Sequence, residues 1–163
     1  MRWNFITYYF IWYLVAKFSN SFYIFLAYLV LAVYLFFHFK FLTNKRKPEI
    51  FFVLTISILG LIFDYFNNIF FNFNWEDLFI IWLMPIWVMF SLTLNFSLSF
   101  IFKNKLILLV SAFIGGPWAY WVASKVMSFS YSLYLPSLVF HGFLWSIFMY
   151  LVMILRNKIC NQN

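Results

Sequence analysis

The feature that most limits how this chain can fold is a series of apolar segments that follow one another with only short polar connections between them. Each segment is about 20 residues long, and at a rise of ~1.5 Å per residue a helix of that length crosses a hydrocarbon core of roughly 30 Å. Of the 163 residues, 66% are hydrophobic and only 9% are charged, a composition that excludes an ordinary soluble domain. The sequence therefore predicts an all-α fold, a polytopic transmembrane helical bundle.

Six helices are expected, within a single integral membrane domain that spans residues 1–163. The apolar segments place these helices at about 3–18, 22–40, 50–69, 78–102, 106–127 and 133–155. The first segment follows a basic residue, as the core of a signal peptide does, but it is rich in Trp and Tyr and no small-residue cleavage site follows it. We therefore interpret it as a retained helix.

The basic residues predict which way the bundle faces. With six spans both chain ends lie on one side, and nine of the eleven Lys and Arg residues fall on that side. They are Arg2, Lys40, Lys45, Arg46, Lys47, Lys103, Lys105, Arg156 and Lys158, against Lys17 and Lys125 on the other side. Because cytoplasmic loops carry the excess of positive charge, both termini are expected in the cytoplasm. Topology thus accounts for the net charge of +7, and no nucleic-acid partner is expected.

The segment 106–127 carries small residues at every fourth position, which form a row along one face of the predicted helix. Helices in lipid associate by close backbone approach, which small side chains permit. A proline in the middle of the segment removes one helical hydrogen bond and predicts a kink. We expect this helix to be the hub of the bundle. Its helix-packing residues are Ser111, Gly115, Gly116, Pro117, Ala119 and Ala123.

Asp64 is the only acidic residue inside a predicted span. A carboxylate in a bilayer is costly unless it is paired, neutral or hydrated, so this position needs an explanation. Asn67 lies about one helical turn away, on the same face. Two interpretations stay open. Asp64 serves as a proton relay, ion site or substrate contact, or it makes a structural hydrogen bond to Asn67 or to a tyrosine.

Three further polar residues, Asn95, Tyr120 and His141, are expected to line the interior of the bundle. Asn95 lies in the inner half of its span, away from Asp64, and either makes an interhelical hydrogen bond or contacts a ligand. Tyr120 is expected within reach of Asp64. His141 lies near the depth of Asp64, where it pairs with the carboxylate or with a backbone carbonyl. His38 is expected at the membrane interface.

The sequence contains no nucleophile–base pair, no Gly-rich phosphate loop and no Cys and His cluster with metal-ligand spacing. The single cysteine, Cys160, excludes an internal disulfide. We therefore assign no catalytic residue, metal ligand or cofactor. Enzymatic activity stays open, and a non-enzymatic protein is favoured.

Three motifs resemble a known family: GLIFD at 60–64, MPIWVMFSLTLNFSL at 84–98 and FIGGPWAY at 113–120. They are similar to a bacterial inner-membrane family labelled domain of unknown function twenty-eight seventy-eight. The positions that match the family pattern are Asp64, Pro85, Trp87, Thr93, Leu94, Asn95, Ser97, Gly115, Gly116, Pro117, Ala119 and Tyr120. Phe96 stands where that pattern has His, which argues against essential chemistry by that His.

The resemblance implies a multi-pass protein of the bacterial inner membrane. Members of the family are in some cases encoded near lipid-modifying enzymes, which implies a lipid-associated or accessory protein without catalysis of its own. The implied partners are membrane lipids and another membrane protein or a lipid-modifying enzyme. The alternative is a small transporter or proton-coupled carrier that uses Asp64, and an intramembrane enzyme ranks below both.

Overall fold

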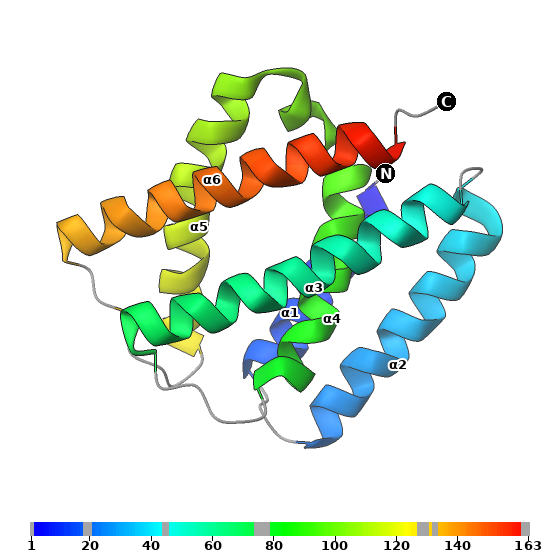
Figure 1. Ribbon diagram of the computed structural model, residues 1–163. Coiled ribbons are helices and arrows are strands. Elements are labelled where there is room, and N and C mark those ends of the chain that lie inside the picture. Colours follow the sequence, from blue (N-terminus) through cyan, green and yellow to red (C-terminus); the bar gives the residue numbers. More distant parts are fainter. Residues whose placement is uncertain are drawn as a thin grey trace.

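The computed structural model describes residues 2–17, 21–43, 46–73, 79–126, 131 and 134–160. Within these ranges the chain forms six α-helices and no strand (Figure 1). They are α1 (Arg2–Lys17), α2 (Ser21–Phe37), α3 (Arg46–Phe71), α4 (Phe79–Asn95), α5 (Lys105–Val126) and α6 (Leu135–Cys160). A π-helical turn, His38–Leu42, continues α2, and a 3₁₀ helix, Ser99–Lys103, lies between α4 and α5. The predicted all-α class is confirmed.

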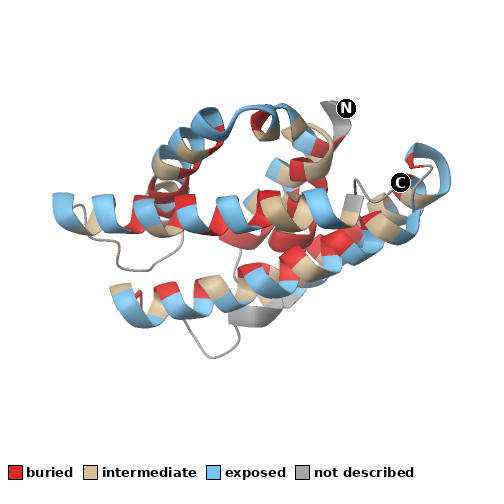
Figure 2. Cartoon of the chain, turned by 45° about the horizontal axis from the view of Figure 1, so that its top comes forward, coloured by how far each residue is buried: buried red, intermediate tan, exposed pale blue. Residues whose placement is uncertain are grey.

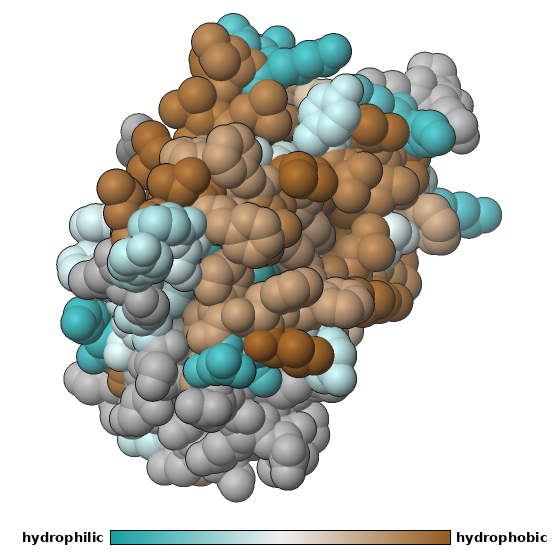
Figure 3. Space-filling model, turned by 60° about the vertical axis from the view of Figure 1, so that its left-hand side comes forward, coloured by the Kyte–Doolittle hydropathy of each residue, from teal (hydrophilic) through white to brown (hydrophobic). Residues whose placement is uncertain are grey.

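Four of the helices in the described part of the chain are long and apolar enough to cross a membrane. They are α2 together with its π-helical turn, α3, α5 and α6, while α4 is apolar but shorter. Large apolar side chains cover their outer faces, and examples are Phe22, Phe25, Phe51, Leu106, Ile114, Phe143 and Ile147. Figure 2 shows this alternation of exposed outer and buried inner faces, and Figure 3 shows a broad hydrophobic surface. Such a surface suits hydrocarbon, since water would penalise an apolar patch of this extent.

The centre of the bundle is the pair α3 and α4, not the predicted hub helix. Helix α4 packs on α1, α2 and α3, and α3 also packs on α6, whereas α5 makes its main contact with α6 alone. The α5–α6 contact is close because Gly142 of α6 lies against the backbone carbonyl of Phe113. Ser146 adds a hydrogen bond from its hydroxyl to the Leu109 carbonyl, 3.1 Å away. The prediction that 106–127 is the hub is therefore wrong, because the small residues of α5 admit one neighbouring helix rather than several.

Three helix bounds differ from those predicted by more than three residues. Helix α3 begins at Arg46 rather than 50, with a proline in its first turn, where the missing N–H costs no hydrogen bond. Helix α4 ends at Asn95 rather than 102. There the Leu98 amide donates to the Thr93 carbonyl and the Ser99 hydroxyl to the Phe96 carbonyl, both at 2.8 Å, and these local bonds replace the helical pattern. Helix α6 continues to Cys160, beyond the predicted end at 155.

Candidate functional site

Two tryptophans, each packed against a glycine of a neighbouring helix, join four helices at the centre of the bundle. The indoles of Trp87 (α4) and Trp145 (α6) are stacked, with ring centroids 6.0 Å apart and planes 11° from parallel. The Trp87 ring lies over Gly60 of α3, and the Trp145 ring lies over Gly116 of α5. A methyl group added at either glycine would overlap with the indole above it. The absence of a side chain at these two positions therefore makes room for the stack.

Asp64 lies directly beside this stack and receives two hydrogen bonds. The indole Nε1–H of Trp87 donates to Oδ2 over 2.6 Å, and the hydroxyl of Tyr120 donates to Oδ1. Asn67 lies about one turn further along α3, and its amide nitrogen is buried without a hydrogen-bond partner among the described residues. Both Asp64 and Asn67 are buried. The structure thus brings together three of the predicted interior residues, and the carboxyl group connects α3, α4 and α5.

His141 lies next to this cluster but bonds elsewhere. Its ring packs edge-on against Tyr120, with centroids 4.6 Å apart. Its Nδ1 lies 2.7 Å from the hydroxyl of Tyr131, in the connection between α5 and α6. Burial raises the pKa of the Tyr131 hydroxyl above its ordinary value, so this group keeps its proton and shares the hydrogen bond as a neutral phenol. The structure shows a His141–Tyr131 bond in the place of either predicted partner, Asp64 or a backbone carbonyl.

A groove of about 560 Å³ runs between α5 on one side and α1 and α4 on the other. Asp64, Tyr120, Trp87 and Trp145 contribute to its deep wall. Its other walls are mostly aromatic or aliphatic, and they include Phe5, Tyr8, Tyr9, Trp12, Trp82, Ile86, Phe90, Leu94, Phe100, Ile101, Leu108, Trp118 and Met149. Pockets of about 300–1,000 Å³ with this kind of lining are typical of sites for small apolar ligands.

The predicted packing row of α5 faces this groove. Ser111, Gly115 and Ala119 are exposed within the chain, and a Cβ added at Gly115 would meet nothing within 4 Å. Ala123 also lines the groove. Helix α5 packs on α6 through the neighbouring face, where Ala112, Gly116, Pro117 and Tyr120 are buried. Of the predicted packing residues, Gly116 and Pro117 are thus buried inside the bundle, while the small-residue row is left open.

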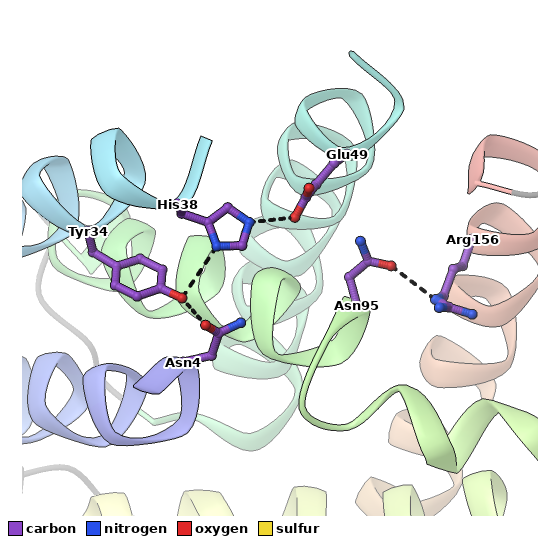
Figure 4. Close-up of polar contacts among 6 residues, drawn as sticks. All are labelled: Asn4, Tyr34, His38, Glu49, Asn95 and Arg156. Carbon is purple, nitrogen blue, oxygen red and sulfur yellow. Dashed lines mark hydrogen bonds and ion pairs between the residues drawn. The ribbon is translucent and has the colours of Figure 1, made fainter. Parts of the chain in front are cut away.

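Asn95 lies away from the Asp64 cluster, at the end of α4. Its side-chain oxygen accepts a hydrogen bond from Nε of Arg156 on α6, 3.2 Å away (Figure 4). The guanidinium of Arg156 also lies over the Phe102 ring, 5.0 Å from its centroid. This contact ties the end of α6 to the point where the fourth helix breaks, which matches the interhelical role predicted for Asn95.

A second buried polar cluster, which the sequence analysis missed, lies near the turn between α2 and α3 (Figure 4). Nε2 of His38 lies 2.8 Å from Oε1 of Glu49, and both side chains are at most 3% exposed. The hydroxyl of Tyr34 donates to Asn4 and lies 3.4 Å from Nδ1 of His38. Phe96, at the position where the family pattern has His, packs edge-on against the His38 ring, with centroids 4.9 Å apart.

The sequence analysis placed His38 at the membrane interface and did not foresee that its side chain is buried against Glu49. His38 follows Ala27, Leu31 and Tyr34 at helical spacing on the inner face of α2, and the early start of α3 places Glu49 opposite it. The i, i+4 spacing of Tyr34 and His38 was the one signal in the sequence. No three His, Cys, Asp or Glu side chains gather in the described ranges, so these residues supply no metal centre there.

The His38–Glu49 pair is expected to show strong energetic coupling. Replacing either residue with leucine leaves the other buried without its partner, at a cost of about 1.5–3 kcal/mol, whereas replacing both removes the need for a partner. Denaturation of the single and double variants in mixed micelles measures the coupling. If the two single effects simply add, the pair does not interact as the structure has it.

The family profile described as "Protein of unknown function (DUF2878)" matches residues 2–151. Neither curated proteins nor solved structures give a match to the chain. The profile covers every helix from α1 to most of α6, including Asp64, Trp87, Gly116 and Tyr120. The chain therefore belongs to the DUF2878 family.

Proposed function

We propose that this protein binds a membrane lipid in the groove between α5 and α1–α4, as a non-enzymatic component of a lipid-modifying system. The observation that carries the proposal is the groove itself, with its apolar walls and its row of small residues on α5. In a bilayer such a groove is in contact with acyl chains, and its walls offer them van der Waals contact but little hydrogen bonding. A lipid chain is therefore the ligand that this surface fits best.

The proposed location is the bacterial inner membrane, with six crossings and both termini in the cytoplasm. The start of α1, the end of α6 and the turn from α2 to α3 lie on the same side of the bundle, which supports this topology (Figure 1). Most described basic residues belong to that side, namely Lys40, Arg46, Lys47, Lys103, Lys105, Arg156 and Lys158. The positive-inside rule then assigns this side to the cytoplasm.

The alternative, a carrier that uses Asp64, rests on the position of this residue in the groove wall. Its two carboxyl oxygens already accept hydrogen bonds from Trp87 and Tyr120. A transported proton or ion would have to compete with both donors during each cycle. A static role for Asp64 and a lipid in the groove therefore fit the geometry better. Uptake into liposomes that disappears in Asp64→Asn would support the carrier instead.

The lipid proposal predicts that filling the groove removes the bound lipid. Gly115→Phe places a ring in the groove, where the structure leaves space beside the α5 backbone. Ile114→Phe adds bulk at the next position, which is exposed and outside the groove lining. Native mass spectrometry of gently purified protein should find lipid on the wild type and on Ile114→Phe, and much less on Gly115→Phe. Equal lipid content in both variants would contradict the proposal.

A further inference from the structure

We infer that the ligand of this groove is an uncharged lipid whose head carries a carbonyl oxygen, bound within the membrane by the indole N–H of Trp145. The inference rests on the proposed function and specifies the class of lipid. Two independent observations carry it: the charge of the groove lining and one buried donor without an acceptor.

The groove offers nothing to neutralise a charged head group. Among the described residues that line it there is no Lys, Arg or His, and the one ionisable acid is Asp64. A phosphate placed there would stand beside a carboxyl group without a counter-charge, in surroundings where an unpaired charge is very costly. An anionic phospholipid could therefore insert its chains into the groove, but its head group would have to remain outside.

The hydrogen-bonding groups of the deep wall are already engaged, with one exception. Asp64 accepts from Trp87 and Tyr120, and the Thr93 hydroxyl donates to the Met89 carbonyl over 2.7 Å. By contrast, Nε1 of Trp145 is buried and has no hydrogen-bond partner among the described residues. A buried N–H without an acceptor is destabilising, so an acceptor from a ligand would be stabilising.

The position of the Trp145 indole places this donor at the groove. Trp145 is 8% exposed and belongs to the groove lining. Its Cγ and Cδ1 atoms are the ones that a Cβ on Gly116 would overlap, so the five-membered ring that carries Nε1 lies against α5. Gly116 also lines the groove. Nε1 itself is covered in the structure, so an oxygen entering beside Gly116 reaches it after a small movement of the indole, and a carbonyl supplies this oxygen without charge.

Ester and ring carbonyls occur in two kinds of uncharged membrane lipid, diacylglycerols and prenyl quinones. The test measures binding of a diacylglycerol, a prenyl quinone, a dialkylglycerol ether and phosphatidylglycerol to the full chain in detergent. We expect the two carbonyl lipids, or one of them, to bind at least tenfold more tightly than phosphatidylglycerol. The ether has the same chains and no carbonyl, and should bind about fivefold more weakly than the diacylglycerol.

Trp145→Phe should weaken carbonyl-lipid binding about fivefold and leave ether binding unchanged. Trp121→Phe is the matched control. Trp121 lies on α5, and its indole N–H is also buried without a partner among the described residues, but it is outside the groove lining. The comparison of ester and ether on the wild type needs no variant, so it decides the question even if Trp145→Phe does not fold. Equal binding of ester and ether would overturn the inference.

The result also separates this inference from the function on which it rests. If phosphatidylglycerol binds as tightly as the uncharged lipids and Gly115→Phe abolishes its binding, the groove binds lipid but the assigned class is wrong. If none of the four lipids binds to the wild type, both the inference and the proposed function fail.

Discussion

Asp64→Leu is expected to lower the free energy of unfolding by roughly 2–5 kcal/mol, because it leaves two buried donors without an acceptor. Trp87 and Tyr120 both direct their polar hydrogens at this carboxyl group. Leucine occupies a similar volume, so the loss comes from the hydrogen bonds and not from a cavity. Asp64→Asn retains one acceptor oxygen and should lose about half as much. Denaturation in mixed micelles, followed by tryptophan fluorescence, measures these differences.

The hydrogen bond between Tyr120 and Asp64 can be tested by removing the Tyr120 hydroxyl both in the wild type and in the Asp64→Leu variant. Tyr120→Phe should destabilise the wild type by about 1 kcal/mol, whereas in the Asp64→Leu background it should restore part of the lost stability, because it removes a donor that has no acceptor. Ser124→Ala is a suitable control, because the Ser124 hydroxyl donates only to the Trp121 carbonyl within α5, 2.8 Å away. Its effect should be small and the same in both backgrounds. An unchanged effect of Tyr120→Phe in the Asp64→Leu background would show that the two residues are not bonded.

Adding one methyl group at Gly60 or Gly116 is expected to destabilise the bundle by about 1–3 kcal/mol, the usual cost of overpacking a filled interior. At both positions the added carbon overlaps with an indole that is itself stacked on a second indole, so the ring cannot simply tilt away. Thermal denaturation of Gly60→Ala and Gly116→Ala should therefore show a clear loss of stability.

Gly115→Ala provides the matched control on the same helix. It makes the same chemical change one residue away, where the new carbon meets nothing within 4 Å. Alanine is also the better helix former, so Gly115→Ala should be neutral or slightly stabilising. Equal melting temperatures for Gly115→Ala and Gly116→Ala would contradict the packing of Trp145 on α5.

The packing of α5 explains why its small residues were assigned to the wrong neighbour. A row at every fourth position identifies a face of a helix, but it does not state whether another helix covers that face. In the structure Trp145 and Gly142 of α6 take the adjacent face, through Gly116 and Phe113. The row that contains Gly115 is left to line the groove. The choice between the two faces depends on side chains of α6, which are distant in the sequence.

What the sequence alone determined was the part of the fold that depends on local composition. Apolar segments long enough to cross a bilayer predict helices wherever they occur, and the motifs around Asp64, Asn95 and Gly116 were sufficient to recognise the DUF2878 family. Tyr120 was also expected within reach of Asp64, because a buried acid is costly without a partner, and its hydroxyl donates to that carboxyl group.

Only the tertiary structure decided which polar groups meet. Glu49 is assigned to a loop when its segment is considered alone, and it becomes a buried partner of His38 because the turn after α2 brings His38 opposite the first turn of α3. The end of α4 at Asn95 is likewise invisible in an apolar segment that continues to residue 102. The His38–Glu49 contact and the end of α4 both depend on hydrogen bonds outside the regular helical pattern. The partners in these bonds cannot be predicted from the hydrophobic periodicity of a single segment.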